Sequence, residues 1–283
     1  MYKTAGQLEF DRYRVSYRCY GNGPAQIVCL SGAKQTISAW KSFVRRFQSD
    51  YQVLVFDMPG QGRSEILQGK PGLDLDEQID VLHHMVQTFD FDGPRIIVGG
   101  SWGSILAATY AARYPQVFSK AALGSFGTKA NPVLESVIED VRRLIDEGRA
   151  KDIAPMMIER FGQYIPEHLK QQIIKQFDHM SEAHFQALYE HSLLATRMED
   201  LHKHVDLTAI EAETLVLMGQ YDTIMDLFDS RRAAEMIPRC RYQLVKKVGH
   251  FLHWEREELL ELYADFFENG LSHAEQTETS QAV

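Results

Sequence analysis

The sequence predicts an α/β fold in which a mostly parallel, doubly wound sheet carries a helical cap inserted between two of its strands. Three observations support this fold class. Runs of β-branched and aliphatic residues alternate along the chain with amphipathic helical stretches. Strand signals disappear between about residues 131 and 209, where apolar residues recur at helical spacing. The segment Gly99-Gly100-Ser101-Trp102-Gly103 separates a strand-like run from an alanine-rich helical run.

The expected elements follow in order along the chain. Expected strands before the helical segment are residues 8–10 and 15–19, which form an opening hairpin, then 25–30, 52–56, 95–98 and 120–126. Expected helices there are residues 39–47, 75–89 and 105–113. Residues 57–64 contain too much glycine and proline for regular structure. After the helical segment, strands are expected at 214–219 and 242–248, and a helix from about Glu255.

This pattern divides the chain into a core and an insertion. Residues 1–130 and 210–270 are expected to form the α/β core, and residues 131–209 the helical cap over the ends of the strands. Met156, Met157, Met180 and Met198 suit an adaptable apolar surface, although packing within the cap is the favoured explanation for any single one of them. Residues 271–283 are polar and lack aromatic side chains, which predicts a disordered tail.

Ser101 is the candidate nucleophile. A serine between glycines, at a sharp turn from strand to helix, is typical of the nucleophile elbow of G-x-S-x-G enzymes. Larger side chains two positions on either side of the serine would collide in this turn, which explains Gly99 and Gly103. The alternative is that Ser101 only fills a tight turn of a parallel sheet.

The candidate partners of Ser101 lie near the end of the chain. Asp222 follows the expected strand 214–219, and His250 follows the strand 242–248. His250 would accept the serine proton, and Asp222 would orient the imidazole and stabilise its charged form. Two nearby rivals are expected to have structural roles instead: Asp226 to cap a helix, and His253 to lie at the start of the last helix.

An oxyanion hole requires a second backbone amide besides that of the residue after the nucleophile, which is Trp102. The loop Ser31-Gly32-Ala33 follows the early strand 25–30, so the amide of Ala33 is the candidate second donor. An ordinary glycine turn is the alternative interpretation of this loop.

Composition excludes several classes of protein. A net charge of −9 argues against binding to nucleic acid or to anionic membrane surfaces. No apolar run approaches the roughly 20 residues of a membrane span, and no signal segment follows Met1. The odd number of cysteines fits reduced thiols, so we expect a cytoplasmic protein. No dinucleotide, phosphate-loop or metal-ligand motif is present, so we expect no cofactor and no metal.

These motifs resemble the α/β-hydrolase superfamily over about residues 8–269. The resemblance rests on the order serine, acid, histidine, on the Asp57-Met58-Pro59-Gly60-Gln61-Gly62 loop and on Gly249-His250. The elbow also resembles that of proline iminopeptidases, although their His-Gly-Gly-Pro-Gly loop is replaced by Ser31-Gly32-Ala33.

A second resemblance is to 3-(3-hydroxyalkanoyloxy)alkanoate synthases and 3-hydroxyacyl-carrier-protein to coenzyme A transacylases. It rests on three segments: 31–40, Phe161-Gly162-Gln163-Tyr164-Ile165-Pro166, and Gly249-His250-Phe251-Leu252 followed by Glu255. The Asp-Glu-Tyr that follows the acid in that family is absent, because Thr223-Ile224 follows Asp222.

That second resemblance implies acyl transfer through an acyl-enzyme, from a 3-hydroxyacyl thioester of coenzyme A or an acyl carrier protein to a hydroxyl or thiol. Arg142-Arg143, Arg149, Lys151, Lys170 and Lys175 could offer an acidic carrier protein a basic surface, or could simply be a solvated helix face. Alternatives are a carboxylesterase, lactonase, thioesterase or peptidase-like hydrolase, and a non-catalytic ligand-binding protein on this fold.

Overall fold

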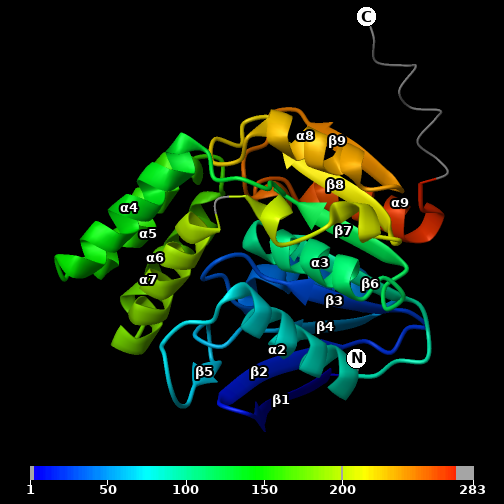
Figure 1. The fold of residues 1–283 in the computed structure, drawn as a ribbon, viewed down its shortest axis with the longest axis horizontal. Helices are drawn as coiled ribbons and strands as arrows, with labels where there is room; N and C mark the ends of the chain where they lie inside the picture. Colours follow the sequence, from blue (N-terminus) through cyan, green and yellow to red (C-terminus); the bar gives the residue numbers. More distant parts are fainter. Residues whose placement is uncertain (1–2, 199, 272–283) are drawn as a thin grey trace, which may run out of the picture.

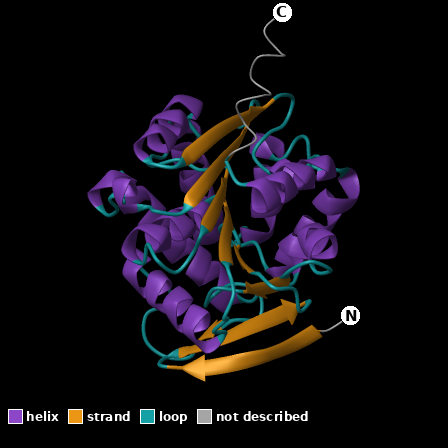
Figure 2. Ribbon diagram, turned by 90° about the vertical axis from the view of Figure 1, so that its right-hand side faces the viewer, coloured by secondary structure: helices purple, strands orange, loops and turns teal. Residues whose placement is uncertain are grey.

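A single twisted sheet lies at the centre of the molecule, between helices on both sides (Figure 2). The computed structural model describes residues 3–198 and 200–271, so the predicted tail, apart from Leu271, lies outside the described residues. The strands are β1 (Lys3–Phe10), β2 (Tyr13–Tyr20), β3 (Gln26–Leu30), β4 (Gln52–Phe56), β5 (Glu65–Ile66), β6 (Arg95–Gly100), β7 (Lys120–Gly124), β8 (Glu213–Gly219) and β9 (Cys240–Val245).

The strand order is β1-β2-β4-β3-β6-β7-β8-β9, and β5 pairs with β2. Strands β1, β2 and β5 pair in antiparallel fashion, whereas β4, β3, β6, β7, β8 and β9 pair in parallel. The predicted fold, a mostly parallel doubly wound sheet, is therefore confirmed. The chain reverses its direction of travel across the sheet between β3 and β6, and ligands of open α/β sheets bind at such a switch point.

Alternation along the central strands explains the two helical layers. In β3, Val28 and Leu30 face one buried apolar cluster, and Ile27 and Cys29 face the other. The first cluster holds α2 (Leu75–Thr88), α3 (Trp102–Arg113) and α8 (Leu227–Met236) against the sheet. The second holds α1 (Lys41–Phe47) and α9 (Leu260–Asn269). Both faces are buried, as a parallel sheet requires.

The segment between β7 and β8 is helical, as the apolar spacing predicted. It contains α4 (Pro132–Asp146), α5 (Ile153–Phe161), α6 (Glu167–Asp178) and α7 (Glu182–Arg197). These helices lie together at one side of the sheet (Figure 1), around a small apolar cluster of their own that includes Ile153, Phe177 and Leu188. The two ends of this helical insert meet where Lys129 and Asp200 form an isolated β-bridge and an ion pair of 3.0 Å.

Several predicted boundaries were wrong. Strand β9 ends at Val245 rather than 248, because Lys247 has a φ of 58°, which no strand residue adopts. Strand β7 ends at Gly124, because Ser125 has a φ of 50°. The last helix begins at Leu260, after two short 3₁₀ turns, instead of near Glu255. Hairpin strands β1 and β2 are longer than predicted, since their register pairs Lys3 with Tyr20.

Two further observations concern membrane-spanning helices and the cysteines. Among the helices of residues 3–198 and 200–271, none has the length and hydropathy needed to cross a bilayer. Cys19, Cys29 and Cys240 are all free thiols, and burial raises the pKa of each.

Candidate active site

Ser101 stands at the turn between β6 and α3, with a backbone φ of 54° and ψ of −121°. Such a conformation costs on the order of 1–3 kcal/mol for a residue other than glycine, and its surroundings hold it in place. A Cβ on Gly99 would lie 2.2 Å from the Gly103 carbonyl oxygen, and one on Gly103 would lie 2.0 Å from that of Leu30. The predicted need for glycine at both positions is confirmed.

The side chains of Ser101, His250 and Asp222 form one hydrogen-bonded chain. His250 Nε2 lies 3.0 Å from Ser101 Oγ, and His250 Nδ1 lies 2.8 Å from Asp222 Oδ2. Asp222 Oδ1 also accepts hydrogen bonds from the backbone amides of Ile224 and Met225, at 3.1 Å each. The structure thus brings together three residues that the sequence placed after three different strands, β6, β8 and β9.

The loop that carries His250 is fixed from two directions. The Glu255 carboxylate accepts hydrogen bonds from the amides of Gly249, at 2.6 Å, and Phe251, at 3.0 Å, which flank the histidine. Burial raises the pKa of Glu255, and these two amide donors oppose that effect. Ser125 Oγ donates to the carbonyl oxygen of His250 at 2.6 Å. The backbone around the imidazole therefore has little freedom.

The two rival residues lie elsewhere. Asp226 caps α8 by accepting from the amides of Phe228, at 2.8 Å, and Asp229, at 3.2 Å, so the predicted capping role is confirmed. His253 lies in a 3₁₀ turn and packs near Trp40, with 5.9 Å between the ring centroids. Burial lowers the pKa of His253 to about 4.

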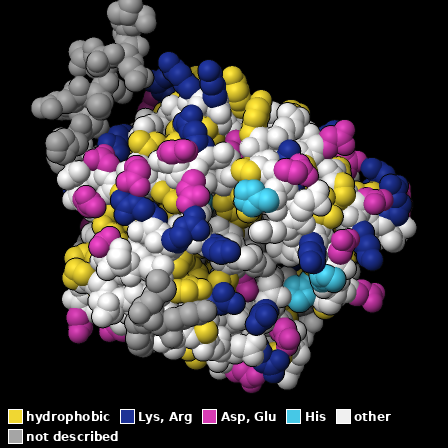
Figure 3. Space-filling view, turned by 180° about the vertical axis from the view of Figure 1, so that it is seen from behind, with side chains coloured by type: hydrophobic (Ala, Val, Ile, Leu, Met, Phe, Trp, Pro, Cys, Tyr) yellow, Lys and Arg dark blue, Asp and Glu magenta, His cyan; other side chains and the backbone are white. Residues whose placement is uncertain are grey.

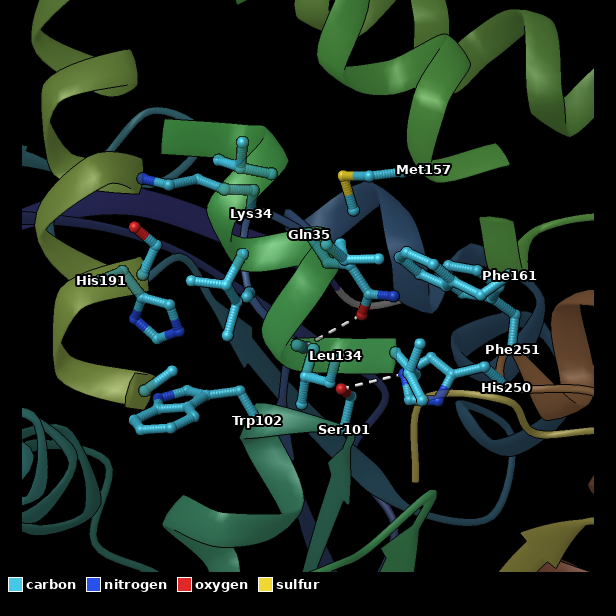
Figure 4. Close-up of a pocket in the computed structure, with 18 of the residues that line it drawn as sticks. Lys34, Gln35, Ser101, Trp102, Leu134, Met157, Phe161, His191, His250 and Phe251 are labelled. Carbon is cyan, nitrogen blue, oxygen red and sulfur yellow. Dashed lines mark hydrogen bonds between the residues drawn. The ribbon is translucent and has the colours of Figure 1, made fainter. Parts of the chain in front are cut away.

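The backbone amides of Ala33 and Trp102 donate to no other residue in the described part of the chain, and both residues line the cavity that reaches Ser101. The loop before Ala33 is held by Trp40 Nε1, which donates to Ser31 Oγ at 2.9 Å. It is also held by the Gly32 amide, which donates to Gln35 Oε1 at 3.0 Å (Figure 4). Both free amides are thus on well-fixed backbone and can serve an oxygen in the cavity.

A cavity of about 200 Å³ opens above Ser101. Apolar side chains of the helical insert form much of its wall, among them Leu134, Val137, Met157 and Phe161. Figure 4 shows Leu134, Met157 and Phe161 around the space above Ser101, with His250 and Phe251 on one side. Of the four methionines singled out in the sequence, Met157 and Met198 line this cavity, and Met156 and Met180 pack among the insert's helices.

Sequence reasoning missed three polar residues at this site: Lys34, His191 and Glu255. Lys34 and His191 line the cavity opposite His250 (Figure 4), and Glu255 entered the sequence analysis only as the start of a helix and as part of a family resemblance. Lys34 and His191 lie far apart in the chain, so no local pattern pairs them, and the φ of 58° at Lys34 cannot be read from sequence. Glu255 lies only six and four residues from Gly249 and Phe251, so its contact is local and depends on how that loop turns. Among residues 3–198 and 200–271, no cluster of His, Cys, Asp or Glu could hold a metal ion.

Comparison with known proteins assigns the family. The model of the alpha/beta hydrolase family matches residues 27–262, so the chain belongs to this family. It is an enzyme fold whose relatives include acyltransferases and hydrolases. The chain is 21% identical to an (R)-3-hydroxydecanoyl-ACP:CoA transacylase of Pseudomonas aeruginosa, over 87% of this chain and 82% of the relative.

One further relative is a hydrolase by name, and one solved structure shares the fold. The chain is 25% identical to a 2-hydroxy-6-oxononadienedioate/2-hydroxy-6-oxononatrienedioate hydrolase of Pseudomonas putida, over 88% of this chain and 89% of the relative. It superposes on the crystal structure of an enol-lactonase from Burkholderia xenovorans with a TM-score of 0.79 and 18% identity, covering 93% of this chain and 100% of the other. This last likeness is one of fold.

Proposed function

We propose that the protein transfers acyl groups through a covalent intermediate on Ser101. The observation that carries this proposal is the hydrogen-bonded chain from Ser101 through His250 to Asp222. A serine hydroxyl is a weak nucleophile until an adjacent base accepts its proton, and the base needs a third group to orient it. A non-catalytic binding protein would have no need of this arrangement on a strained turn.

The reaction runs in two halves. Ser101 Oγ attacks the carbonyl carbon of the acyl donor while its proton passes to His250 Nε2. The amides of Ala33 and Trp102 stabilise the oxyanion that forms. The tetrahedral intermediate collapses, the bond to the leaving thiol breaks, and that thiol takes the proton from His250. An acceptor then loses its proton to His250 and attacks the carbonyl carbon of the acyl-enzyme. The bond from that carbon to Ser101 Oγ breaks, His250 returns the proton to Oγ, and the acceptor leaves with the acyl group.

We propose further that residues 131–209 act as a cap that covers the reaction and shapes the acyl pocket. Helices α4, α5 and α7 supply side chains that line the cavity above Ser101. Val137 on α4 is buried and lines this cavity, whereas Val133 on the same helix is 38% exposed and does not. Val137→Phe should therefore shift the preferred acyl chain to a shorter length, and the control Val133→Phe should not. An unchanged preference in Val137→Phe would refute the proposed role of α4.

The proposed donor is a 3-hydroxyacyl thioester of coenzyme A or an acyl carrier protein, and the acceptor a hydroxyl or a thiol. Support comes from the named activity of the Pseudomonas aeruginosa relative and from the segments 31–40, 161–166 and 249–252. The apolar cavity suits an alkyl chain, and water must be kept from the acyl-enzyme for transfer to compete with hydrolysis.

Docking of an acidic carrier protein would require a local basic surface. The arginines proposed for it are largely compensated: Arg143 pairs with Asp140 and Glu147, and Arg149 with Glu147 and Asp152. Charges of both signs are also interspersed over the face seen in Figure 3. Lys151 and two lysines of α6, Lys170 and Lys175, remain as candidates, and Lys175 borders a second, larger hollow next to the acyl cavity.

The second candidate function is hydrolysis, favoured by the names of the Pseudomonas putida relative and of the enol-lactonase. A single experiment separates it from transfer. The enzyme is incubated with a 3-hydroxyacyl thioester and an excess of a hydroxy acid or of coenzyme A, and the products are analysed by mass spectrometry. Transfer gives a new ester or thioester, whereas hydrolysis gives only the free acid.

The acyl-enzyme itself is tested by intact-mass analysis of the wild type and Ser101→Ala. The wild type should gain the mass of the acyl group, and Ser101→Ala should not. We expect Ser101→Ala and His250→Ala to lose at least about 10³-fold in kcat/KM. Full turnover by Ser101→Ala on the substrates of the wild type would refute the assignment.

A further inference from the structure

Lys34 is a buried lysine with no acidic partner. Its residue is 7% exposed, and it forms no ion pair with any Asp or Glu in the described part of the chain. Its Nζ donates to the Gly60 carbonyl oxygen at 2.8 Å. An ammonium group has three N–H donors and an uncharged amine has two, so at least one remains for another acceptor.

Lys34 lies in the wall of the acyl cavity and also borders the second, larger hollow. Lys34 lines the cavity and directly follows Ala33, whose amide we assign to the oxyanion hole. Consecutive Cα atoms are about 3.8 Å apart, so Lys34 begins close to the carbonyl of a bound acyl group. Figure 4 shows its side chain on the side of the cavity away from His250, toward His191.

His191, on α7, offers complementary chemistry next to Lys34. It lines the same cavity, and its ring packs edge-on against Trp102, with 4.5 Å between centroids. Burial and the nearby charge of Lys34 lower the pKa of His191 to about 3, so its imidazole is neutral at neutral pH. A neutral imidazole has one donor and one acceptor nitrogen, and neither has a partner among the described residues.

We propose that Lys34 and His191 form a subsite that binds a hydroxyl group on one of the first carbons of the acyl chain. A hydroxyl oxygen can accept a hydrogen bond from the Lys34 ammonium while its proton is donated to the free imidazole nitrogen of His191. A carboxylate could accept from Lys34 and from the imidazole N–H, but it has no proton to donate to the acceptor nitrogen of His191. An unsubstituted chain would leave the imidazole of His191 and the remaining donors of Lys34 unpaired, and a site with buried polar groups discriminates strongly against such an analogue.

This inference deepens the proposed function, because it assigns the recognition of a hydroxyacyl group to two residues. The alternative is that Lys34 only ties its loop to Gly60. A structural tie would affect all substrates equally, whereas a binding subsite affects the hydroxylated ones. The test is therefore a ratio of affinities rather than a single activity.

The experiment measures binding to Ser101→Ala protein, which cannot form the acyl-enzyme, by isothermal titration calorimetry. The probes are the N-acetylcysteamine thioesters of 3-hydroxyoctanoic acid and of octanoic acid. We expect the hydroxylated thioester to bind about tenfold more tightly or better. Adding Lys34→Met, which keeps the length of the side chain, or His191→Phe should reduce this ratio to about one or two.

Lys170→Met, made in the same background, is the matched control. The Nζ of Lys170 also donates to a backbone carbonyl, that of Gln163 at 3.0 Å, but it is outside the cavity. Its variant should keep the full ratio. A ratio near one in Ser101→Ala itself, or a ratio that both added substitutions leave unchanged, would overturn the proposal.

A third probe, with a carboxylate on the carbon that carries the hydroxyl, tests the type of oxygen group. Tighter binding of this probe than of the hydroxylated one would overturn the assignment to a hydroxyl, and weaker binding supports it. Failure of the binding preference leaves the mass test of the acyl-enzyme unaffected. Failure of that mass test leaves the binding preference measurable, so the two proposals fail separately.

Discussion

Glu255→Gln should impair both the stability and the activity of the protein. The Glu255 carboxylate accepts from the two amides that flank His250, at 2.6 and 3.0 Å. Glutamine retains one acceptor oxygen and places an NH₂ group against the second amide. Since a hydrogen bond to a charged group contributes about 1.5–3 kcal/mol, we expect the free energy of unfolding to fall by about 2–3 kcal/mol.

The same change should slow the reaction, because the imidazole must hold its position between Ser101 and Asp222. A small misplacement of a catalytic group can cost on the order of 10²-fold in rate, so we expect kcat/KM to fall about 10- to 100-fold. Unfolding in guanidinium chloride measures the loss of stability. Steady-state kinetics with a short ester that Ser101 accepts measures the loss of activity.

Glu257→Gln is the matched control for Glu255→Gln. Glu257 pairs with Arg45 at 2.5 Å, but the two side chains are 58% and 61% exposed. A surface ion pair of this kind contributes about 0–1 kcal/mol. If Glu255→Gln were no more destabilising than Glu257→Gln and had the same kcat/KM as the wild type, then Glu255 would not position His250.

Three further predictions concern stability. Gly103→Ala should prevent folding or lower the melting temperature sharply, because its Cβ would meet the Leu30 carbonyl oxygen at 2.0 Å. The control Gly100→Ala, with nothing within 4 Å of its Cβ, should melt close to the wild type. Equal melting temperatures of the two variants would contradict this prediction. Ser125→Ala should lower the free energy of unfolding, measured in guanidinium chloride, by about 1 kcal/mol, because the Ser125 hydroxyl donates to the His250 carbonyl oxygen. An unchanged free energy of unfolding would show that water replaces this hydrogen bond. Burial lowers the pKa of Lys34 from 10.5 to about 7, so the unfolded chain binds more protons between these values and folding stability rises with pH there. From pH 7 to 9.5 the free energy of unfolding of the wild type should rise by on the order of 2–3 kcal/mol relative to that of Lys34→Met. If the free energies of both proteins changed with pH by the same amount, the lowered pKa of Lys34 would be refuted.

Much of the fold was predictable because its signals are local. The buried parallel strands consist of short apolar runs, and the helices of the insert repeat their apolar residues at helical spacing. The glycines on either side of Ser101 follow from the crowding of one turn. Strand ends were less predictable: β9 stops at Val245, although a strand was expected as far as Val248, because Lys247 leaves the extended conformation.

The residues of the candidate site also divide into those that the sequence predicted and those that only the tertiary structure revealed. Sequence order alone selected Ser101, Asp222 and His250, since each follows a strand and the carboxyl ends of parallel strands meet at one edge of the sheet. Only the tertiary structure placed Glu255 on both amides beside His250, and Lys34 at Gly60 and near His191. The Lys34–Gly60 contact joins two loops of the core, the Glu255 contacts fold one loop back on itself, and His191 reaches Lys34 only because α7 of the insert packs on the core. Such packing depends on shape and burial over the whole molecule, and it leaves no periodic or local pattern in the chain.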